Sequence, residues 1–405
     1  MLDLVRVANK PLMKPWARSR RKLLHEVPRP NPVGQLTIDG PDADRILVIG
    51  SGLALGLGVD SHDEALAGCL GRSLADLTGR GADVDILTDA TMTVNTIGDY
   101  LRKVTLRRYD AVVLSLGINE SLALMGDRAW KRDLQVVVDT LTAAIAPSAR
   151  VFVVAVHSIR SIPVYNSRLG GLAEEQAASL NAASAALCST TERAIFVPLS
   201  AVGGADGGRS IRATYEDWAT ELCDAMFDPL NVARAESAQA LSALDEAEVE
   251  RERQRGVDAT GILDTGPEDR FDRIVDMART LYGTESAAFS VIDRDRQWHK
   301  SRSNVADQQV SRVGSFCSIT VTDRGPMIVL DALTDDRVSD SPQVTDDPNI
   351  RFYAGFPVES PDGSRIGALC VFDPAPRDEA DVDPAMLRQL AHLIQAELRV
   401  KPTFD

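Results

Sequence analysis

Two polar residues stand where a nucleophile and a base could work together. Ser51 follows the strand-like run Arg45–Ile49, and His157 follows the strand-like run Val151–Val156. Sites of parallel sheets form at the carboxyl ends of the strands, so Ser51 and His157 can meet as a dyad in which the imidazole takes the hydroxyl proton. The other interpretation of His157 is a hydrogen-bonded loop residue.

A third polar residue, Asn119, lies in the segment Gly117–Glu120, directly after the apolar run Asp110–Leu116. An amide at a strand end can donate a hydrogen bond to the oxyanion that forms during acyl transfer. It can equally cap the helix that follows the strand.

The elements that would position these residues are short apolar runs alternating with helical stretches. The strand-like runs are Arg45–Ile49, Val84–Leu87, Asp110–Leu116, Val151–Val156 and Ala194–Leu199. The helical stretches are His62–Leu77, Thr96–Val104, Asp127–Ile145 and Gly171–Leu187. This alternation predicts a flavodoxin-like parallel sheet with helices on both faces.

The segment ILVIGSGLALGLGVDSHDEALAG, followed by LSLGINE, resembles the SGNH/GDSL hydrolase family over about residues 45–227. In that family a Gly-Asp-Ser turn supplies the nucleophilic serine, a glycine amide and an Asn bind the oxyanion, and a D-x-x-H segment supplies acid and base. The resemblance implies an ester-hydrolase fold whose site lies at the turn after the first strand of the domain.

Two of the three residues that this chemistry needs are of the wrong type here. The family pattern puts Gly52 at the nucleophile position, and Arg209, after Asp206, stands where the family has histidine. Arginine stays protonated and cannot act as a general base, and losing one triad member costs orders of magnitude in rate. We therefore predict an inactive domain that binds an anion or a polar small molecule through Ser51, Gly52, Asn119 and Arg209.

The last third of the chain is similar to a second family. The segments GILDTGPEDRFDRIVDMARTLYG, FSVIDRDRQWHKSR, SFCSI, IRFYAGFPVESPDG and IGALCVFD resemble, in this order, the GAF domain family. The resemblance implies an α+β fold with an antiparallel sheet, a small-molecule pocket on one sheet face, and dimerisation through helices. Aromatic rings and cations can hold a planar or anionic ligand. The candidate residues are Trp298, Lys300, Phe316, Cys317, Arg351, Phe352, Tyr353 and Cys370.

These candidates also have structural interpretations. Phe316, Cys317 and Cys370 lie in apolar contexts, where a free Cys acts as a small hydrophobe. The segment Trp298–Lys300 has the pattern of an exposed strand, which argues against haem ligation by its histidine. Arg351 can form an ion pair, and the acidic residues nearby in the sequence are Asp331, Asp335, Asp336 and Asp347.

The composition excludes several classes of protein. Hydrophobic residues at 44% and charged residues at 25% of 405 are average for a soluble chain, and the length predicts two domains. A net charge of −15 makes nucleic-acid binding unexpected. The five cysteines form no CxxC pair, which predicts reduced thiols and no metal site. Without an apolar span or a secretory signal, we expect a cytoplasmic protein with no identified cofactor.

Prolines and charges suggest the domain boundaries. We expect a basic, Pro-containing arm and linker at 1–44, the SGNH-like domain at 45–228, a connecting helix at 229–256 and the GAF-like domain at 257–401. Residues 1–30 hold eight Lys/Arg against two acidic residues, so the arm is either a solvated tail or a contact for an anionic membrane face. The 234–256 helix and the GAF helices are the predicted contacts of a homodimer.

Two functions compete. The first is a sensor whose GAF-like domain binds an unidentified small molecule and signals through the inactive hydrolase-like domain, the arm or a protein partner. The missing serine and histidine favour it, and no histidine-kinase, cyclase, phosphodiesterase or helix-turn-helix segment accompanies the GAF-like part. The second is a GAF-regulated esterase or acyl hydrolase that uses Ser51 with an unorthodox base, His157.

Overall fold

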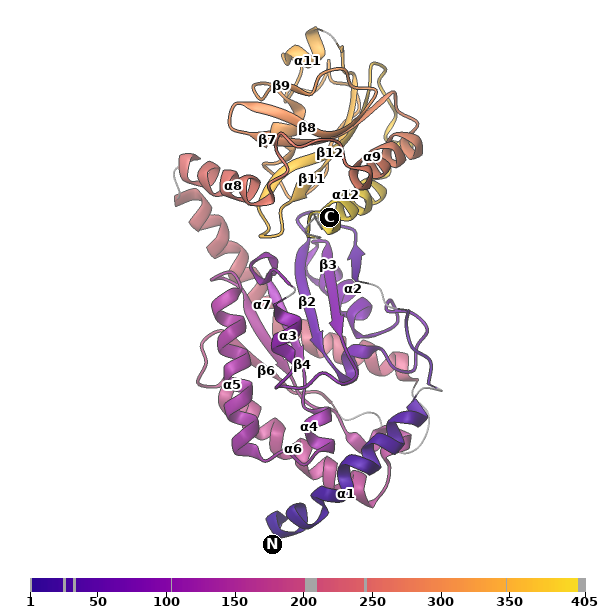
Figure 1. Cartoon of the computed structure of the whole chain (residues 1–405), viewed down its shortest axis with the longest axis vertical. Coiled ribbons are helices and arrows are strands. Elements are labelled where there is room, and N and C mark those ends of the chain that lie inside the picture. Colours follow the sequence, from indigo (N-terminus) through magenta and orange to yellow (C-terminus); the bar gives the residue numbers. More distant parts are fainter. Residues whose placement is uncertain are drawn as a thin grey trace. The chain divides into compact units, whose positions relative to one another are not determined.

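The chain folds into two units, Met1–Gln239 and Ala240–Asp405, each with its own sheet (Figure 1). The computed structural model describes residues 2–24, 27–31, 34–102, 104–200, 210–243, 246–346 and 348–399, and side chains within these ranges except those of 2–8 and 237–246.

The N-terminal unit is built on a six-stranded sheet in the order β1-β3-β2-β4-β5-β6. Its strands are β1 (Gln35–Ile38), β2 (Asp44–Gly50), β3 (Ala82–Thr88), β4 (Ala111–Ser115), β5 (Arg150–Val154) and β6 (Ala194–Val197). β2 to β6 are parallel, and β1 pairs antiparallel with β3 at the edge. The chain moves from β2 to β3 on one side and returns to β4 on the other, so the carboxyl ends of β2 and β4 flank the switch point where ligands bind in such sheets.

Helices cover both faces of this sheet because the strands bury side chains on either side (Figure 1). The helices are α1 (Leu2–Leu23), α2 (Leu66–Thr78), α3 (Ile97–Leu101), α4 (Ile118–Leu122), α5 (Asp127–Ala144), α6 (Arg168–Cys188) and α7 (Ile211–Ala243). On one face, α2 and α7 pack against the sheet in a core that includes Ile46 of β2 and Trp218 of α7. On the other face, α3, α5 and α6 pack in a core that includes Leu47 of β2 and Trp130 of α5. The predicted parallel fold is confirmed.

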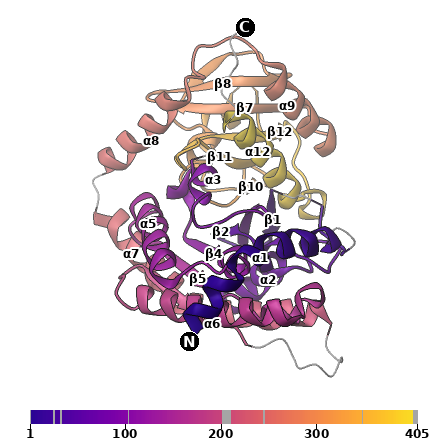
Figure 2. The same ribbon diagram turned by 60° about the horizontal axis from the view of Figure 1, so that its bottom comes forward.

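The N-terminal segment is helical and packed, whereas its prolines led us to expect a basic arm and linker outside the core. α1 contains Pro11 and Pro15, and Met13 is fully buried in a cluster with Tyr165. Packing of an apolar face can offset the hydrogen bond that a proline removes from a helix. Contacts with α4 and with the turn after β5 place α1 over the carboxyl end of the sheet, and Figure 2 shows it there in indigo.

The C-terminal unit is built on an antiparallel sheet in the order β10-β11-β12-β7-β8-β9. Its strands are β7 (Ser286–Asp293), β8 (Arg296–Ser303), β9 (Gln309–Ser311), β10 (Met327–Val329), β11 (Phe352–Glu359) and β12 (Arg365–Asp373). Its helices are α8 (Glu246–Thr260), α9 (Asp269–Tyr282), α10 (Phe316–Thr320), α11 (Pro342–Thr345) and α12 (Pro384–Arg399). β11 and β12 form an antiparallel hairpin, and the predicted α+β fold is confirmed.

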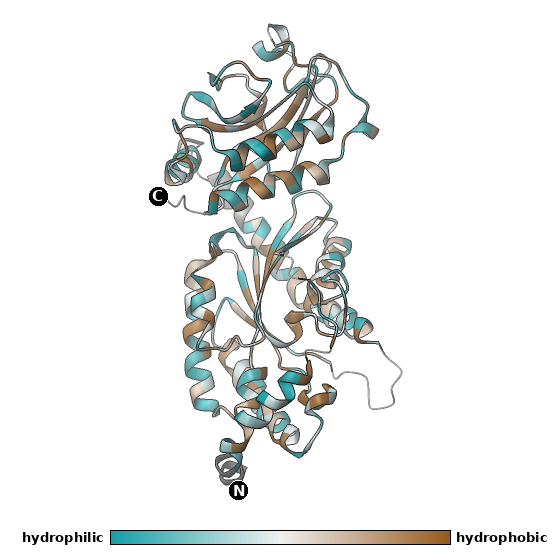
Figure 3. Cartoon of the chain, turned by 45° about the vertical axis from the view of Figure 1, so that its right-hand side comes forward, coloured by the Kyte–Doolittle hydropathy of each residue, from teal (hydrophilic) through white to brown (hydrophobic). Residues whose placement is uncertain are grey.

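Each face of this second sheet has its own apolar layer. α9, α12 and the end of α8 cover one face through a core with Phe271 and Phe289. α10 and α11 contribute to the other layer, which includes Phe316 and Tyr353. Figure 3 shows brown, apolar residues along the strands and on one side of several helices. The expectation of an exposed strand at Trp298–Lys300 was wrong: β8 lies between β7 and β9, and all three residues are buried.

The expected connecting helix at 229–256 corresponds to the end of one helix, α7, and most of the next, α8. α7 reaches Ala243, and its Leu230 is buried in the N-terminal core. α8 begins at Glu246, and its Val257 is buried in the C-terminal core. None of the helices in the described ranges is long and apolar enough to cross a membrane.

Candidate functional site

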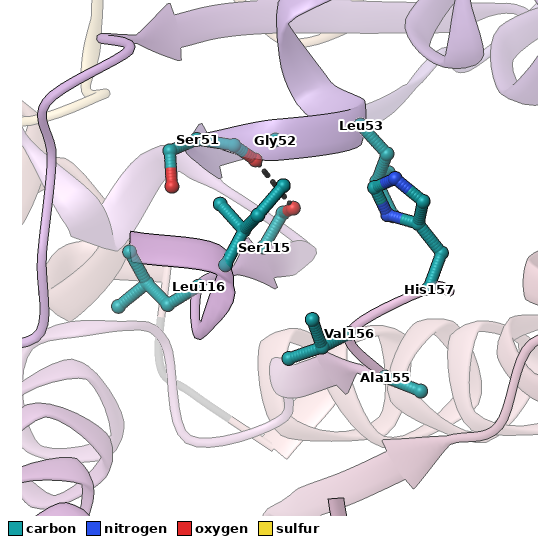
Figure 4. Close-up of a pocket in the computed structure, with 9 residues that line it drawn as sticks. Ser51, Gly52, Leu53, Ser115, Leu116, Ala155, Val156 and His157 are labelled. Carbon is teal, nitrogen blue, oxygen red and sulfur yellow. Dashed lines mark hydrogen bonds between the residues drawn. The ribbon is translucent and has the colours of Figure 1, made fainter. Parts of the chain in front are cut away.

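The carboxyl ends of β2, β4 and β5 bring together the polar residues of the N-terminal unit. Ser51 follows β2, Asn119 lies in α4 after β4, and His157 follows β5. Ser51 and His157 line one small cavity of about 10 Å³, together with Ser115 and residues of the β4 and β5 ends (Figure 4). The three residues therefore lie together at the carboxyl ends of the parallel strands.

Ser51 is buried and oriented by its backbone. Its N–H donates to the carbonyl of Ser115 at 2.8 Å, and the Ser115 hydroxyl donates to the Ser51 carbonyl at 2.8 Å. The Ser51 hydroxyl points away from the imidazole of His157 in Figure 4, and it accepts a hydrogen bond from the amide nitrogen of Asn119 at 3.5 Å. A serine without a base in hydrogen-bond reach is a poor nucleophile.

His157 is held by packing. Its ring lies against Trp218, with the ring centroids 5.2 Å apart. Burial lowers the pKa of His157 to about 4, although the charge of Glu174 acts in the opposite direction. The imidazole is therefore neutral at pH 7, and it forms part of a cavity wall.

Asn119 has its side chain fully engaged. The amide donates to the carbonyl oxygens of Ala90 at 3.1 Å and Met92 at 2.8 Å. Its oxygen accepts from Nη2 of Arg21 on α1 at 2.8 Å. An oxyanion donor must direct a free N–H toward the reacting atom. The N–H groups of Asn119 are already used, so its side chain instead connects α1, α4 and the loop after β3 by hydrogen bonds. It does not cap α4 either, because the residue before that helix is Gly117.

The position that the family pattern assigns to the nucleophile has a backbone suited to glycine. Gly52 has φ of 67°, in the left-handed region. A Cβ atom here would lie 3.3 Å from Cγ2 of Ile118, so a side chain would need both backbone strain and a shift of its neighbour. Asp206 and Arg209 lie outside the described residues.

Two charged residues at this edge were missed from the sequence. The carboxylate of Glu120 accepts hydrogen bonds from the N–H groups of Val94 at 2.6 Å and Gly117 at 3.0 Å, and burial raises its pKa. Glu120 stands where the family motif has Asp, and this position is the signal in the sequence that could have identified it. Arg21 was counted in the basic arm, and no local pattern links it to Asn119.

A larger, mostly apolar cavity of about 310 Å³ adjoins the small one. Its volume is at the lower end of the range for small-molecule sites. Leu24 and Val27, which follow α1, form part of its wall, so the N-terminal segment helps to enclose it. The lining residues are Leu24, Val27, Gly52, Leu53, Leu57, Gly58, Ile118, His157, Ser161, Ile162, Pro163, Val164, Ile211, Tyr215 and Trp218. This lining suits an apolar ligand better than the anion or polar molecule that the sequence led us to expect.

The candidate residues of the C-terminal unit divide between the two faces of its sheet. Trp298 belongs to the α9 layer. On the same side, Nζ of Lys300 donates to Thr265 Oγ1 at 2.7 Å and to the Gly266 carbonyl at 2.8 Å, and it pairs with Glu268 at 2.7 Å. The buried charge of Lys300 is thus satisfied within the unit.

The other face gathers Phe316, Cys317, Tyr353 and Cys370. The rings of Phe316 and Tyr353 lie 4.8 Å apart, and the sulfurs of Cys317 and Cys370 lie 3.7 Å apart. Phe352, another candidate from the sequence, belongs instead to the α9 layer. The four side chains on the α10 face are in mutual contact, in keeping with the packing interpretation.

Arg351 forms the ion pair that was one of its two interpretations. Its Nε and Nη2 donate to the two carboxylate oxygens of Asp331, each at 2.7 Å. Asp347 lies outside the described residues. Among the residues in the described ranges, no three His, Cys, Asp or Glu side chains are grouped to hold a metal ion.

Residues 266–398 match the GAF domain family, so the C-terminal unit contains a GAF domain, as predicted. A cyclic di-GMP phosphodiesterase of Pseudomonas aeruginosa is 38% identical over 152 residues, which are 37% of this chain and 26% of that protein. The chain spans about a quarter of the length of this curated relative.

Similar solved structures include hydrolases. TesA is 19% identical, with a TM-score of 0.35, and the match covers 46% of this chain and 99% of TesA. The lipase Lip_vut3 from a goat rumen metagenome is 11% identical, with a TM-score of 0.37, over 46% of this chain and 98% of the lipase. A type II free methionine-R-sulfoxide reductase from Thermoplasma acidophilum is 13% identical, with a TM-score of 0.25, over 32% of this chain and 95% of the reductase. The protein thus combines a GAF domain with a second unit that is built on a mostly parallel α/β sheet.

Proposed function

We propose that this chain is a cytoplasmic sensor in which a GAF domain is coupled to a hydrolase-like unit that binds a ligand without hydrolysing it. The observation that carries the proposal is the engagement of Asn119, whose amide is occupied by Ala90 and Met92 and whose oxygen is occupied by Arg21. With glycine at the nucleophile position, the unit keeps a pocket but lacks the attacking and stabilising groups of an ester hydrolase.

The GAF domain supports the sensor role, since this family binds small molecules. The similarity to a protein named as a cyclic di-GMP phosphodiesterase also fits a role in signalling. All five cysteines are free and buried, in keeping with a reducing compartment. The homodimer through the 234–256 helix or the GAF helices, the protein partner and the membrane contact of the arm stay predictions, which sedimentation, affinity and vesicle-binding measurements can check.

For the hydrolase-like unit we propose an apolar ligand such as an acyl chain. Its cavity of about 310 Å³ is lined by aliphatic and aromatic side chains, with His157, Ser161 and Tyr215 as the polar groups of the wall. Burial of apolar ligand surface contributes about 25 cal/mol per Å², and a few polar groups then fix its orientation.

An ester assay tests the absence of catalysis. The purified chain is mixed with p-nitrophenyl acetate and compared with Ser51→Ala and His157→Ala. We expect the same background rate for all three proteins, because the described geometry gives Ser51 no base. Hydrolysis that disappears in both variants would refute the proposal and establish a Ser51–His157 dyad.

A calorimetric titration with octanoate tests the ligand. We expect saturable binding that is lost in Ile162→Trp, which fills the cavity, and retained in Val136→Trp, whose site on α5 is 62% exposed. Equal binding to both variants, or no binding to the unaltered protein, would contradict the assignment of this cavity.

A second candidate function is a GAF-regulated acyl hydrolase. One observation favours it: Ser51 and His157 line the same small cavity, and the low pKa of His157 leaves its imidazole neutral and able to accept a proton. The mechanism requires the Ser51 hydroxyl to turn toward the imidazole, and the ester assay decides between the two functions.

A further inference from the structure

We propose that Cys317 and Cys370 of the GAF domain form a reversible disulfide and that hydrogen peroxide is its oxidant. Their sulfurs are 3.7 Å apart, within contact distance and on facing elements. Cys370 lies on β12, and Cys317 lies on α10, which covers that face of the sheet. The other three cysteines, Cys69, Cys188 and Cys223, belong to the N-terminal unit and serve as internal controls.

The surroundings of the two thiols are unusually polar for a core. The Tyr353 hydroxyl donates to the sulfur of Cys317 at 3.5 Å and shares a 2.8 Å hydrogen bond with Thr320. The Ser290 hydroxyl also acts to lower the pKa of both thiols. Beyond Ser290 lies the buried amide of Gln297, at 3.3 Å. Hydrogen-bond donors around a sulfur stabilise its thiolate.

These contacts divide the roles between the two cysteines. The contact with Cys370, the hydrogen bond from Tyr353 and the Ser290 hydroxyl lower the pKa of Cys317, although burial acts in the opposite direction. The pKa of Cys370 is raised, by its contact with Cys317 and by burial. Since the thiolate is the nucleophile in cysteine oxidation, Cys317 reacts first and Cys370 resolves.

The reaction balances with one peroxide per disulfide. The Cys317 thiolate attacks one peroxide oxygen, the O–O bond breaks, and the departing hydroxide takes a proton and leaves as water, so that Cys317 becomes a sulfenic acid. The sulfur of Cys370 then attacks the sulfur of Cys317, the S–O bond breaks, and the hydroxyl group leaves with the Cys370 proton as a second water. The two thiols lose two electrons, and the peroxide gains them.

Burial selects the oxidant. Each cysteine is only 2% exposed, so a bulky disulfide such as oxidised glutathione cannot reach either sulfur in the folded domain. Hydrogen peroxide is little larger than water and can enter during local opening. The same enclosure keeps the sulfenic acid next to Cys370, its resolving thiol.

Oxidation also has a structural consequence. A disulfide brings the sulfurs to about 2.05 Å, and Cys370 sits on an inner strand paired with both β11 and β7. Since the inner strand is held on both sides, the approach of the two sulfurs therefore moves mainly α10. The Ser318 hydroxyl of α10 donates to the Arg312 carbonyl at 3.0 Å, and Arg312 Nη2 bonds Glu250 on α8 at 3.1 Å. The thiol pair is thus linked to α8 through two hydrogen bonds.

A thiol assay tests the disulfide. Intact protein is treated with hydrogen peroxide, and free thiols are then counted after denaturation. We expect loss of two of the five thiols, recovery with dithiothreitol, and a peptide that joins Cys317 to Cys370. The loss should persist in Cys188→Ser and be absent in Cys317→Ser, while Cys370→Ser should accumulate a dimedone-reactive sulfenic acid at Cys317.

Two results would overturn the disulfide. One is retention of both thiols at peroxide levels that fully oxidise free glutathione, and the other is a linkage between different cysteines. Because the readout uses neither an ester nor octanoate, it stands or fails independently of the function proposed above.

Hydrogen exchange tests the link to α8. We expect faster amide exchange in residues 246–260 of the oxidised protein, and we expect Arg312→Gln to remove most of that difference. Identical exchange of α8 in the reduced and oxidised proteins would refute the transmission to α8 even where the disulfide forms.

Discussion

Replacing His157 with Phe should flatten the pH dependence of stability of the N-terminal unit in mildly acidic solution. Phe keeps an aromatic ring against Trp218 but cannot take up a proton. In the unaltered protein, burial lowers the pKa of His157 to about 4 from its ordinary 6.5. The folded state therefore binds fewer protons than the unfolded state between these values.

The sign and size of the effect follow from this difference. The contribution of neutral His157 is fully present above pH 6.5 and is lost progressively as the pH falls toward 4, because protonation favours the unfolded chain. At about 1.36 kcal/mol per pKa unit, the full loss is about 3 kcal/mol, and about 2.5 kcal/mol of it is lost between pH 7.5 and 4.5.

Urea unfolding at pH 7.5, 5.5 and 4.5 measures this loss in both proteins. Tryptophan fluorescence follows the N-terminal unit through Trp130 and Trp218, which are buried in its two cores, once Trp298 of the C-terminal unit is replaced with Phe in both proteins. Groups other than His157 titrate equally in the two proteins, so the difference between their slopes isolates this imidazole. Parallel slopes, or an NMR titration that gives His157 a pKa near 6.5, would refute the reasoning.

Five other substitutions, measured by urea unfolding, test packing, backbone strain and charge. Met13→Ala should lower the free energy of unfolding by about 3 kcal/mol, because the side chain is fully buried. Leu12→Ala, at a site that is 56% exposed, should lower it by less than about 0.5 kcal/mol. Equal losses would contradict the packing of α1. Gly50→Ala should lower the free energy of unfolding by more than about 4 kcal/mol, because its Cβ would lie 1.9 Å from the carbonyl oxygen of Ser115. Gly79→Ala should lower it by about 1–2 kcal/mol, because the site has open space and only its φ of 69° is unfavourable for a side chain. Burial alone would raise the pKa of Glu250, but two arginines lower it to about 2, so its contribution is present above pH 4.5 and is lost as the pH falls toward 2. Glu250→Gln should therefore remove about 1 kcal/mol at pH 7, after allowance for a side chain that is 37% exposed, and little at pH 2.

Regular alternation made much of the fold predictable from the sequence. Five apolar runs became the parallel strands, because a strand buried on both faces needs a continuous apolar run. The segment Pro361–Ser364 became the turn between β11 and β12, because its residue types suit a tight turn. These features depend on neighbours in the chain, which a local pattern records.

The features that were missed depend on partners far away in the chain. Arg21 and Asn119 are 98 positions apart, and no local pattern predicts their hydrogen bond. Pro11 and Pro15 argued against a helix, but the tertiary contacts of Met13 outweigh that preference. Lys300 looked solvent-exposed by its residue type, and its burial depends on acceptors from the loop before α9.

The packing of α1 affects how the N-terminal unit can be isolated. A cut at residue 45, where the family resemblance begins, would remove α1 and uncover Tyr165, Ala173 and Ala177, the side chains on which Met13 packs. It would also remove β1 and leave the long edge strand β3 with unpaired backbone groups. Exposed apolar surface next to an open strand edge promotes aggregation. The shorter fragment should therefore be recovered mainly as insoluble protein, and a fragment that starts before α1 should stay soluble.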